Sequence, residues 1–128
     1  MVNIFKKVRK GRLKKFKINN NVLSFGSVGL KAIESGIVNK NQLESARKVL
    51  IRKTNRKIKI WINLVFNYSV TAKPLGTRMG KGKGKITHYC SKVSGGTIIF
   101  EVLGNNKKIL INALKCCKIK LPIKTTIF

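Results

Sequence analysis

Negative charge is almost absent from this sequence. It contains three glutamates (Glu34, Glu44 and Glu101), no aspartate and a single histidine, His88. Paired carboxylates for glycoside hydrolysis, an aspartate cluster for magnesium and a Ser-His-Asp arrangement cannot be assembled from these residues. Most classes of enzyme are therefore excluded. One enzymatic alternative stays open, because His88 and Cys90 would share a face of a strand, although no acidic residue nearby could orient the histidine.

Cysteine is also scarce, and its spacing is not that of a metal site. The three cysteines are Cys90, Cys116 and Cys117. An adjacent pair cannot form an ordinary unstrained disulfide, and no Cys-x-x-Cys spacing occurs. We expect reduced structural thiols, with no metal and no cofactor bound.

Long apolar runs are missing too. The longest candidate, residues 58–66, is interrupted by Lys59 and Asn63 and falls short of the ~20 apolar residues that a membrane span needs. Residues 1–17 alternate basic and apolar side chains like an amphipathic transit peptide, but they include no serine and no apolar signal core. We expect no membrane span, and we interpret the N-terminal segment as part of the mature protein.

Positive charge, in contrast, dominates the 128 residues. Lys and Arg number 29, which gives a formal net charge of +26, while 43% of the residues are hydrophobic. The length and the apolar content predict one small folded domain and not a disordered basic tail. Self-repulsion at this charge destabilises a compact chain unless a polyanion neutralises it, and a nucleic-acid backbone is the commonest polyanion in cells. The composition therefore indicates a nucleic-acid partner.

The choice among residue types carries a further indication about the gene. The chain has 23 Lys against 6 Arg, together with 16 Ile and 12 Asn. Lys, Ile and Asn have A- and T-rich codons. The bias is typical of an organellar gene or of an AT-rich bacterium.

Hydrophobic patterning predicts an arm followed by an α+β domain. Residues 1–21 have no sustained period and predict a basic N-terminal arm that becomes ordered against a partner, whereas residues 22–128 carry the folded domain. Residues 22–33 mix β-formers with two glycines and predict a bent strand that closely approaches another backbone. Ser35 and Gly36 predict a turn.

A basic helix is predicted after Asn39, because Gln42 follows three residues later as in a capping box. The apolar face of this helix consists of Leu43, Ala46, Leu50 and Ile51. The other sides carry Lys40, Arg47, Lys48, Arg52 and Lys53. A charged outer face is common to surface helices, but here only Glu44 offsets the cations, which favours contact with RNA.

Residues 58–64 alternate with the period of a strand. The predicted apolar face consists of Ile58, Ile60, Ile62 and Leu64. Trp61 points the other way, where it either stacks on a base or, as we prefer, fills a second core layer.

The C-terminal third predicts two more strands, a helix and a last strand. Residues 86–93 and 97–103 predict a hairpin joined by Ser94, Gly95 and Gly96. Asn105 is the expected N-cap of the second helix. The apolar stripe of that helix consists of Ile109, Leu110, Ala113, Leu114 and Cys117. In residues 121–128, Pro122 stops the helix and the β-branched run that follows predicts the last strand.

The most informative stretch is the glycine/lysine loop, residues 74–85. Alternating glycines leave backbone amides sterically open while the intervening lysines supply charge, which suits contact with phosphates. The interval from Gly76 to Gly80 does not fit a nucleotide-triphosphate loop, and Gly82 stands where the magnesium-binding hydroxyl is needed. A mobile linker is the alternative, but it would not need the Arg-Met pair that stands beside the glycines.

Several motifs, in this order, resemble the bacterial-type large-subunit ribosomal protein L sixteen family. They are Phe-Gly-Ser-Val-Gly-Leu-Lys-Ala at 25–32, Lys-Ile-Trp-Ile at 59–62, the Arg-Met-Gly-Lys-Gly-Lys-Gly run within 73–84, and Lys-Leu-Pro-Ile-Lys-Thr-Thr at 120–126. The basic segment 5–12 is also similar to the family's N-terminal motif. The resemblance covers nearly the whole chain. It implies a single α+β domain, an α/β-hammerhead-like fold with a mixed sheet and two helices.

The resemblance also implies a function. Such a protein is a structural constituent of the large ribosomal subunit that binds ribosomal RNA beside the aminoacyl-tRNA site, with neighbouring large-subunit proteins as partners and no homo-oligomer. The implied rRNA-binding residues are Lys6, Lys7, Arg9, Lys10, Arg12, Lys14, Arg47, Arg52 and Lys59. The loop is implied to extend toward the peptidyl transferase centre and the tRNA acceptor arms. Its implied tRNA-proximal residues are Arg78, Met79, Gly80, Lys81, Gly82, Lys83 and Gly84.

Some positions depart from the family pattern. The family's Pro-Asp-Lys-Pro turn is Phe-Asn-Tyr-Ser at 66–69, and Asn63 replaces the usual arginine two positions after the tryptophan. This divergence, with the Lys, Ile and Asn bias, favours an organelle-encoded protein of the mitochondrial ribosome, in the matrix, over a protein of an AT-rich bacterium. The alternative function is a basic nucleic-acid-binding module outside the ribosome.

Overall fold

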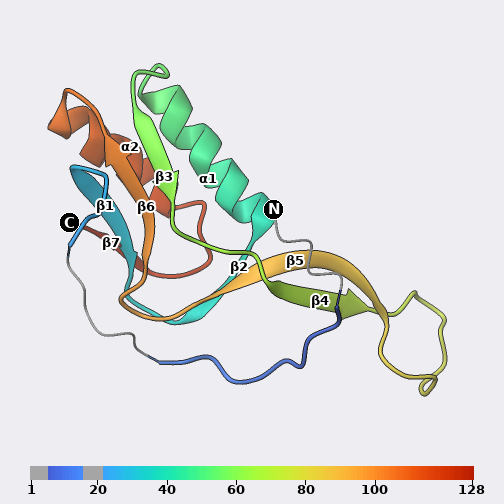
Figure 1. Ribbon diagram of the computed structural model, residues 1–128. Coiled ribbons are helices and arrows are strands. Elements are labelled where there is room, and N and C mark those ends of the chain that lie inside the picture. The colour runs from blue at the N-terminus through green and yellow to red at the C-terminus, as the bar shows by residue number, and fades with distance from the viewer. Residues whose placement is uncertain (1–5, 16–21) are drawn as a thin grey trace.

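The computed structural model describes residues 6–15 and 22–128 (Figure 1). Seven strands and two helices lie in this part of the chain. In chain order they are β1 (Val28–Ala32), β2 (Gly36–Asn39), α1 (Lys40–Lys53), β3 (Lys59–Ile62), β4 (Tyr68–Ala72), β5 (Lys85–Val93), β6 (Ile98–Leu103), α2 (Lys107–Lys118) and β7 (Thr125–Ile127). No helix in the described residues is long and apolar enough to cross a membrane.

The strands form two antiparallel sheets. One has the order β3-β6-β1-β7 and the other the order β2-β5-β4. The α+β class and the two helices are confirmed, whereas the expectation of a mixed sheet is wrong because every strand pair in the described residues is antiparallel.

The expected hairpin between residues 86–93 and 97–103 is also wrong. β5 pairs with β2 and β4, while β6 pairs with β1 and β3, so the connection between β5 and β6 passes from one sheet to the other. The end of β1 holds this connection, since the Gly96 N–H donates to the Ala32 carbonyl at 2.8 Å and the Ala32 N–H donates to Thr97 at 2.9 Å. The glycines allow this crossing, as Gly96 has a φ of 86°.

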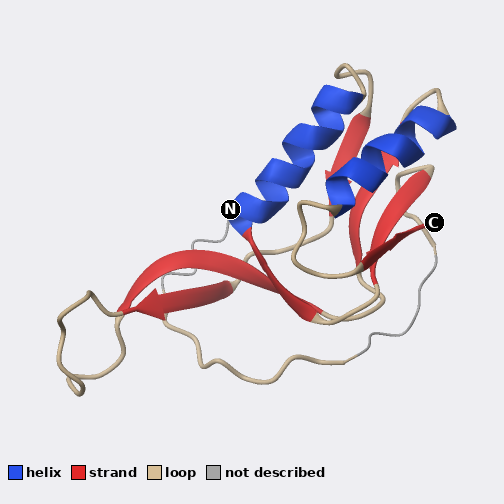
Figure 2. Ribbon diagram, turned by 180° about the vertical axis from the view of Figure 1, so that it is seen from behind, coloured by secondary structure: helices blue, strands red, loops and turns tan. Residues whose placement is uncertain are grey.

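The core lies between the four-stranded sheet and the two helices, which pack side by side on one face of that sheet (Figure 2). Paired residues of β1 and β6 point toward the helices, and helix residues fill the space above them. The largest fully buried hydrophobic side chains are Phe100, Leu30, Leu50, Ile99, Leu110 and Leu114. The three-stranded sheet projects away from this core (Figures 1 and 2).

Both helices occur where periodicity predicts them. Asn39 is the N-cap of α1, and its N–H donates to the Gln42 Oε1 at 2.9 Å. The cap of α2 is Asn106 and not Asn105, because the Asn106 side chain accepts hydrogen bonds from the N–H groups of residues 108 and 109. Ile109 is 47% exposed, so its predicted place in the apolar stripe is wrong.

The strands differ more from expectation than the helices. The predicted turn at Ser35 and Gly36 leads directly into β2, and residues 66–69 enter β4. Residues 22–33 contain a strand only from Val28 onward, and the last strand begins at Thr125. Ile62, the last residue of the edge strand β3, is 39% exposed, so its predicted place on a buried apolar face is wrong.

Candidate nucleic-acid interface

The glycine/lysine loop is the tip of a two-stranded ribbon. The last pair of the β4–β5 ladder is Ala72 with Lys85, so the loop that was expected at 74–85 spans residues 73–84 in the structure. Figure 1 shows this loop projecting from the body of the molecule, at the end of the curved β5 strand. The side chains of Leu75 and Met79 are fully exposed there. The loop therefore has no core of its own and is presented to solvent.

Glycine meets two different needs in this loop. Gly80 and Gly82 have positive φ angles of 98° and 78°, with open space where a side chain would stand. Gly84 instead packs on the opposite strand, where a Cβ atom would lie 2.4 Å from the Ala72 carbonyl oxygen. The first two glycines shape the tip, and Gly84 allows the strands to meet at its base.

One cation of the loop, Lys73, is held by the loop itself. The Lys73 ammonium donates to the Gly80 carbonyl at 2.5 Å, across the loop. Among the described residues, the side chains of Arg78 and Lys81 make no hydrogen bond or ion pair with the protein, and both are exposed. These two cations are available for an external anion.

The described part of the arm, residues 6–15, lies along the three-stranded sheet (Figure 1). Its backbone makes the contacts: the Val8 N–H donates to the Ser69 Oγ at 3.2 Å, and the Ser69 hydroxyl donates to the Lys6 carbonyl at 3.1 Å. Farther along, the Ser35 hydroxyl lies 2.7 Å from the Lys14 carbonyl oxygen, to which it donates. Because the backbone faces the domain, the predicted rRNA-binding side chains face solvent. Those at Lys6, Lys7, Arg9, Lys10, Arg12 and Lys14 are all exposed.

The arm also contacts the base of the glycine/lysine loop. The Lys83 ammonium donates to the Val8 carbonyl at 2.5 Å, and the Lys7 ammonium donates to the Lys83 carbonyl at 2.9 Å. Two regions 75 residues apart in sequence are thereby joined. Lys83 therefore has a partner in the arm, unlike Arg78 and Lys81, with which it was grouped as a tRNA-proximal residue.

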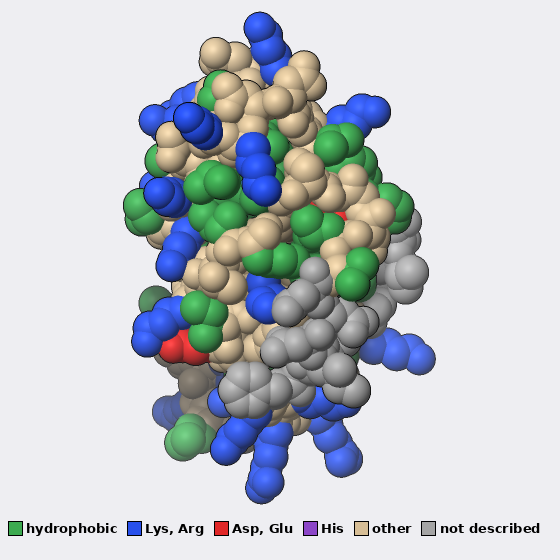
Figure 3. All heavy atoms as spheres, turned by 90° about the vertical axis from the view of Figure 1, so that its left-hand side faces the viewer, with side chains coloured by type: hydrophobic (Ala, Val, Ile, Leu, Met, Phe, Trp, Pro, Cys, Tyr) green, Lys and Arg blue, Asp and Glu red, His purple; other side chains and the backbone are tan. Residues whose placement is uncertain are grey.

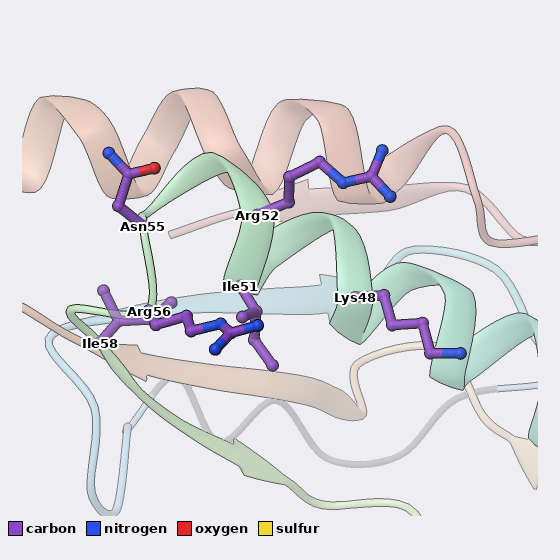
Figure 4. A pocket seen from close by; sticks show the side chains of 6 residues that line it. All are labelled: Lys48, Ile51, Arg52, Asn55, Arg56 and Ile58. Carbon is purple, nitrogen blue, oxygen red and sulfur yellow. The ribbon is translucent and has the colours of Figure 1, made fainter.

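A second basic region is an open groove of about 860 Å³ at the C-terminal end of α1 (Figure 4). Its lining residues are Lys48, Ile51, Arg52, Asn55, Arg56 and Ile58. Asn55 and Arg56 both have positive φ angles, 50° and 60°, in the turn that leads to β3. Of the predicted residues the groove contains Arg52. Lys48 and Arg56 were not among the predicted site residues, although the run of cations around this turn is a signal that could have included them.

The other two predicted residues of this region, Arg47 and Lys59, differ in whether their charge is free to bind an external anion. Arg47 forms an ion pair with Glu44 at 2.6 Å, and its hydrogen bond is the main reason that the pKa of the Glu44 carboxyl is lowered. Lys59 is exposed on the edge strand β3. In Figures 1 and 2 the end of α1 lies far from the glycine/lysine loop, so the structure divides the predicted residues into an arm-and-loop region and an α1–β3 region.

The three glutamates leave little negative charge on the surface. Glu34 pairs with Lys124 at 2.9 Å, Glu44 pairs with Arg47, and Glu101 is buried. The face of the molecule in Figure 3 accordingly shows many Lys and Arg side chains around exposed hydrophobic ones, and little red. A surface of this kind attracts polyanions along its whole length.

The cysteines form no metal centre or disulfide. All three thiols are free, and no group of three or more His, Cys, Asp or Glu that could hold a metal ion occurs among residues 6–15 and 22–128. Burial in the core, with a smaller effect of Cys116, raises the pKa of the Cys117 thiol to about 12. The buried Cys90 thiol donates to the Tyr68 carbonyl at 3.6 Å, whereas the exposed His88 ring contacts the Thr87 hydroxyl at 3.0 Å, so the two do not form the pair that the enzymatic alternative requires.

Comparison with known proteins decides among the alternatives. Residues 3–128 match the family model of ribosomal protein L16p/L10e. The chain belongs to this ribosomal protein family. It is 42% identical over 123 residues to the large ribosomal subunit protein uL16 of Blochmanniella pennsylvanica, a match that spans 96% of this chain and 91% of that protein. It is 40% identical over 120 residues to the large ribosomal subunit protein uL16c of Cyanidium caldarium, spanning 94% of this chain and 86% of the other.

Membership of the L16p/L10e family confirms the resemblance on which the sequence interpretation depended. The protein is a structural component of the large ribosomal subunit and acts in translation, and it is not an enzyme. This conclusion sets aside both the free nucleic-acid-binding module and the enzyme that would have used Cys90.

Proposed function

We propose that the protein binds large-subunit ribosomal RNA beside the aminoacyl-tRNA site and helps to position tRNA. The observation that carries this proposal is the form of the glycine/lysine loop. It projects from the body on a ribbon, has no apolar anchor, and presents Arg78 and Lys81 to solvent. A loop of this shape can contact tRNA while the rest of the molecule is bound to rRNA.

The rRNA is the ligand that we assign to the arm and to the α1–β3 region. The arm is tied to the sheet through its backbone and directs a row of cations outward, an arrangement suited to successive phosphates. The groove at the end of α1 adds cations, and the apolar side chains of Ile51 and Ile58 also line it. In this proposal the phosphate contacts fix the orientation of the domain, and a single copy of the chain occupies each subunit.

The arm gives a first test. Replacing Arg9, Lys10 and Arg12 with alanine should weaken binding to rRNA and flatten its dependence on salt concentration by up to ~0.9 per lost phosphate contact, using the value for duplex DNA. The salt slope of RNA binding, measured by filter retention, checks this. Because the backbone of the arm holds it to the sheet, the variant should fold normally. An unchanged slope would show that these side chains only face solvent.

Site-directed crosslinking tests whether the loop contacts tRNA while the arm contacts rRNA. A photoreactive amino acid in place of the fully exposed Met79 should crosslink to the acceptor arm of tRNA in reconstituted large subunits, while the same reagent in place of Lys10 should crosslink only to rRNA. Subunits without tRNA are the control for the first, and they should lose its tRNA product. If position 79 crosslinks only to rRNA whether or not tRNA is bound, the proposed role in tRNA positioning is wrong.

We also propose that this ribosome is mitochondrial. The support is compositional, namely the excess of Lys, Ile and Asn, together with the departures from the family pattern at 66–69 and at Asn63. The relatives come from a bacterium and a plastid, which leaves the compartment open. Fractionation of the source cells would decide, since a mitochondrial protein sediments with large subunits from purified mitochondria and a bacterial one has no such compartment.

A further inference from the structure

One aromatic pair lies outside the core, next to Lys59 of the α1–β3 region. The rings of Phe25 and Trp61 are stacked, with centroids 5.8 Å apart and an interplanar angle of 20°. Trp61 lies opposite Glu101 in the β3–β6 ladder, in alternation with Ile60 and Val102, which face the helices. The pair therefore lies on the face of the four-stranded sheet that the helices do not cover.

The outer ring of this pair is exposed. Phe25 has 62% of its surface accessible although it is a large hydrophobic residue, and Trp61 beneath it is half-buried. The expected role of Trp61 as a filler of a second core layer is thus only partly correct, because Trp61 is half-buried and stacks on an exposed ring. One face of Phe25 rests on the tryptophan, and the other has no comparable ring partner among the described residues.

Phe25 is held firmly by its backbone. Its N–H donates to Glu101 Oε2 at 2.8 Å, and the next N–H, that of Gly26, donates to the same oxygen at 3.0 Å. Gly26 is also packed so closely on β6 that a Cβ atom would lie 2.8 Å from the Val102 nitrogen. With this backbone fixed and the ring already stacked on Trp61, Phe25 loses little conformational freedom when a ligand stacks on its other face.

The charge around the pair suits a nucleic-acid ligand. Lys59 is exposed and lies two residues before Trp61 on the same face of β3. The acidic residue beside the pair, Glu101, is 1% exposed and its carboxylate is occupied by hydrogen bonds, so it does not repel a phosphate strongly at the surface. An exposed, fixed aromatic ring next to a cation is the arrangement that proteins use to bind unstacked bases.

We propose that the exposed face of Phe25 stacks on an unpaired base of ribosomal RNA, with Lys59 near the adjacent phosphate. This site rests on the proposed function, since it requires that the protein binds rRNA, and it adds a base-stacking contact to the phosphate contacts of the arm and groove. Stacking of this kind tolerates any base.

The fluorescence of Trp61 can be used to follow this contact, because Trp61 is the only tryptophan of the chain and stacks on Phe25. Adding single-stranded RNA to the purified protein should change the Trp61 fluorescence, whereas duplex RNA, with its bases already stacked, should change it much less. Phe25→Leu should lower the affinity for single-stranded RNA by about five- to hundredfold, and Phe25→Tyr should restore it. The salt slope should be the same in all three proteins, because stacking neutralises no phosphate.

Three results would separate this proposal from the one it rests on. Unchanged affinity of Phe25→Leu, with normal RNA binding by the natural protein, overturns the stacking site alone. Failure of the natural protein to bind rRNA at all overturns the proposed function. In assembled large subunits, Phe25→Leu should make one rRNA base reactive to a chemical probe. If no base changes and only a neighbouring protein becomes accessible, the occupant of this surface is a protein and the proposal is wrong.

Folding of the variants needs its own control. Phe25→Leu keeps the backbone hydrogen bonds to Glu101 and should unfold at nearly the temperature of Phe25→Tyr. A loss of RNA affinity in Phe25→Leu that is matched by a loss in a Val65→Ser variant, which changes another exposed hydrophobic side chain, would count against a specific stacking contact.

Discussion

Replacing Glu101 with alanine is expected to lower the free energy of unfolding by about 3 kcal/mol and the melting temperature by about 10 °C. The carboxylate is 1% exposed and accepts hydrogen bonds from the backbone of Phe25 and Gly26 and, at 2.7 Å, from the Asn63 side chain. Alanine leaves these donors without an acceptor in a largely buried place. The segment before β1 would then lose its attachment to β6.

Protonation should have a similar, smaller effect. Burial raises the pKa of the Glu101 carboxyl, but the hydrogen bonds from Phe25, Gly26 and Asn63 outweigh it, so that its pKa is lowered in the folded protein. A carboxyl with a lowered pKa stabilises the fold above its unfolded pKa, and this contribution is lost as the pH falls through the folded value. Stability should therefore decrease at acid pH, and less so in Glu101→Ala.

Two variants make the test specific. Glu101→Gln keeps one acceptor oxygen, and its new NH₂ can be accommodated if the Asn63 amide turns over, so the loss should be about half that of alanine. Glu44→Ala removes only a half-exposed ion pair with Arg47 and should cost about 0.5 kcal/mol or less. Thermal unfolding in moderate salt, followed by circular dichroism, measures all three. Equal losses in Glu44→Ala and Glu101→Ala would contradict the role of the buried carboxylate.

The same carboxylate shows why part of this fold was predictable and part was not. Helices α1 and α2 depend on local signals, namely caps such as Asn39 and an apolar stripe such as that of Leu43 and Leu50, and both were predicted. The partners of Glu101 come from residues 75 and 38 positions away in sequence. No local pattern indicates such a contact.

The prediction of strand pairing was wrong for a related reason. Two β-patterns separated by Ser94, Gly95 and Gly96 are typical of a hairpin, but they are equally compatible with a crossing between sheets. In the structure, the connection between β5 and β6 is hydrogen-bonded to the backbone of Ala32 at the end of β1, which favours the crossing. The true ribbon, β4–β5, encloses a loop of residues 73–84 that is too long to produce a hairpin signal in the sequence.

The candidate interface was predictable in its residue types more than in its geometry. The cations of the glycine/lysine loop and those at residues 6–15 of the arm are exposed, as their lack of an apolar period indicates. The arm's attachment to the sheet was not predictable, because it uses backbone carbonyls and the hydroxyl of Ser69, which no side-chain periodicity reveals. The same is true of the Lys83 contact with Val8 that joins arm and loop.

Shortening the glycine/lysine loop is expected to separate assembly from tRNA binding. If residues 73–84 are replaced by Asn-Gly, a two-residue turn can close the ribbon after the Ala72–Lys85 pair, and the core and the α1–β3 region stay intact. Large subunits should contain this variant in normal amount, since the loop has too little apolar surface to anchor itself. They should bind aminoacyl-tRNA at least tenfold more weakly, a change of about 1.4 kcal/mol, and elongate slowly.

A charge-matched pair of variants shows which property of the loop matters. The shortened loop also loses the Lys83 contact with the arm. Arg78→Gln with Lys81→Gln keeps the full loop and that contact, and removes two loop cations whose side chains have no partner among the described residues. Lys107→Gln with Lys108→Gln removes the same charge from the exposed start of α2. Only the loop variant should weaken tRNA binding, because a general change in charge acts equally at both places.

If both double variants bind tRNA normally while the shortened loop does not, the loop acts through its shape and its contact with the arm, and the phosphate contacts proposed for Arg78 and Lys81 are wrong. If the shortened protein fails to assemble, the loop itself holds the protein on the ribosome. The proposal that the arm and the α1–β3 region bind rRNA while the loop contacts tRNA is then wrong.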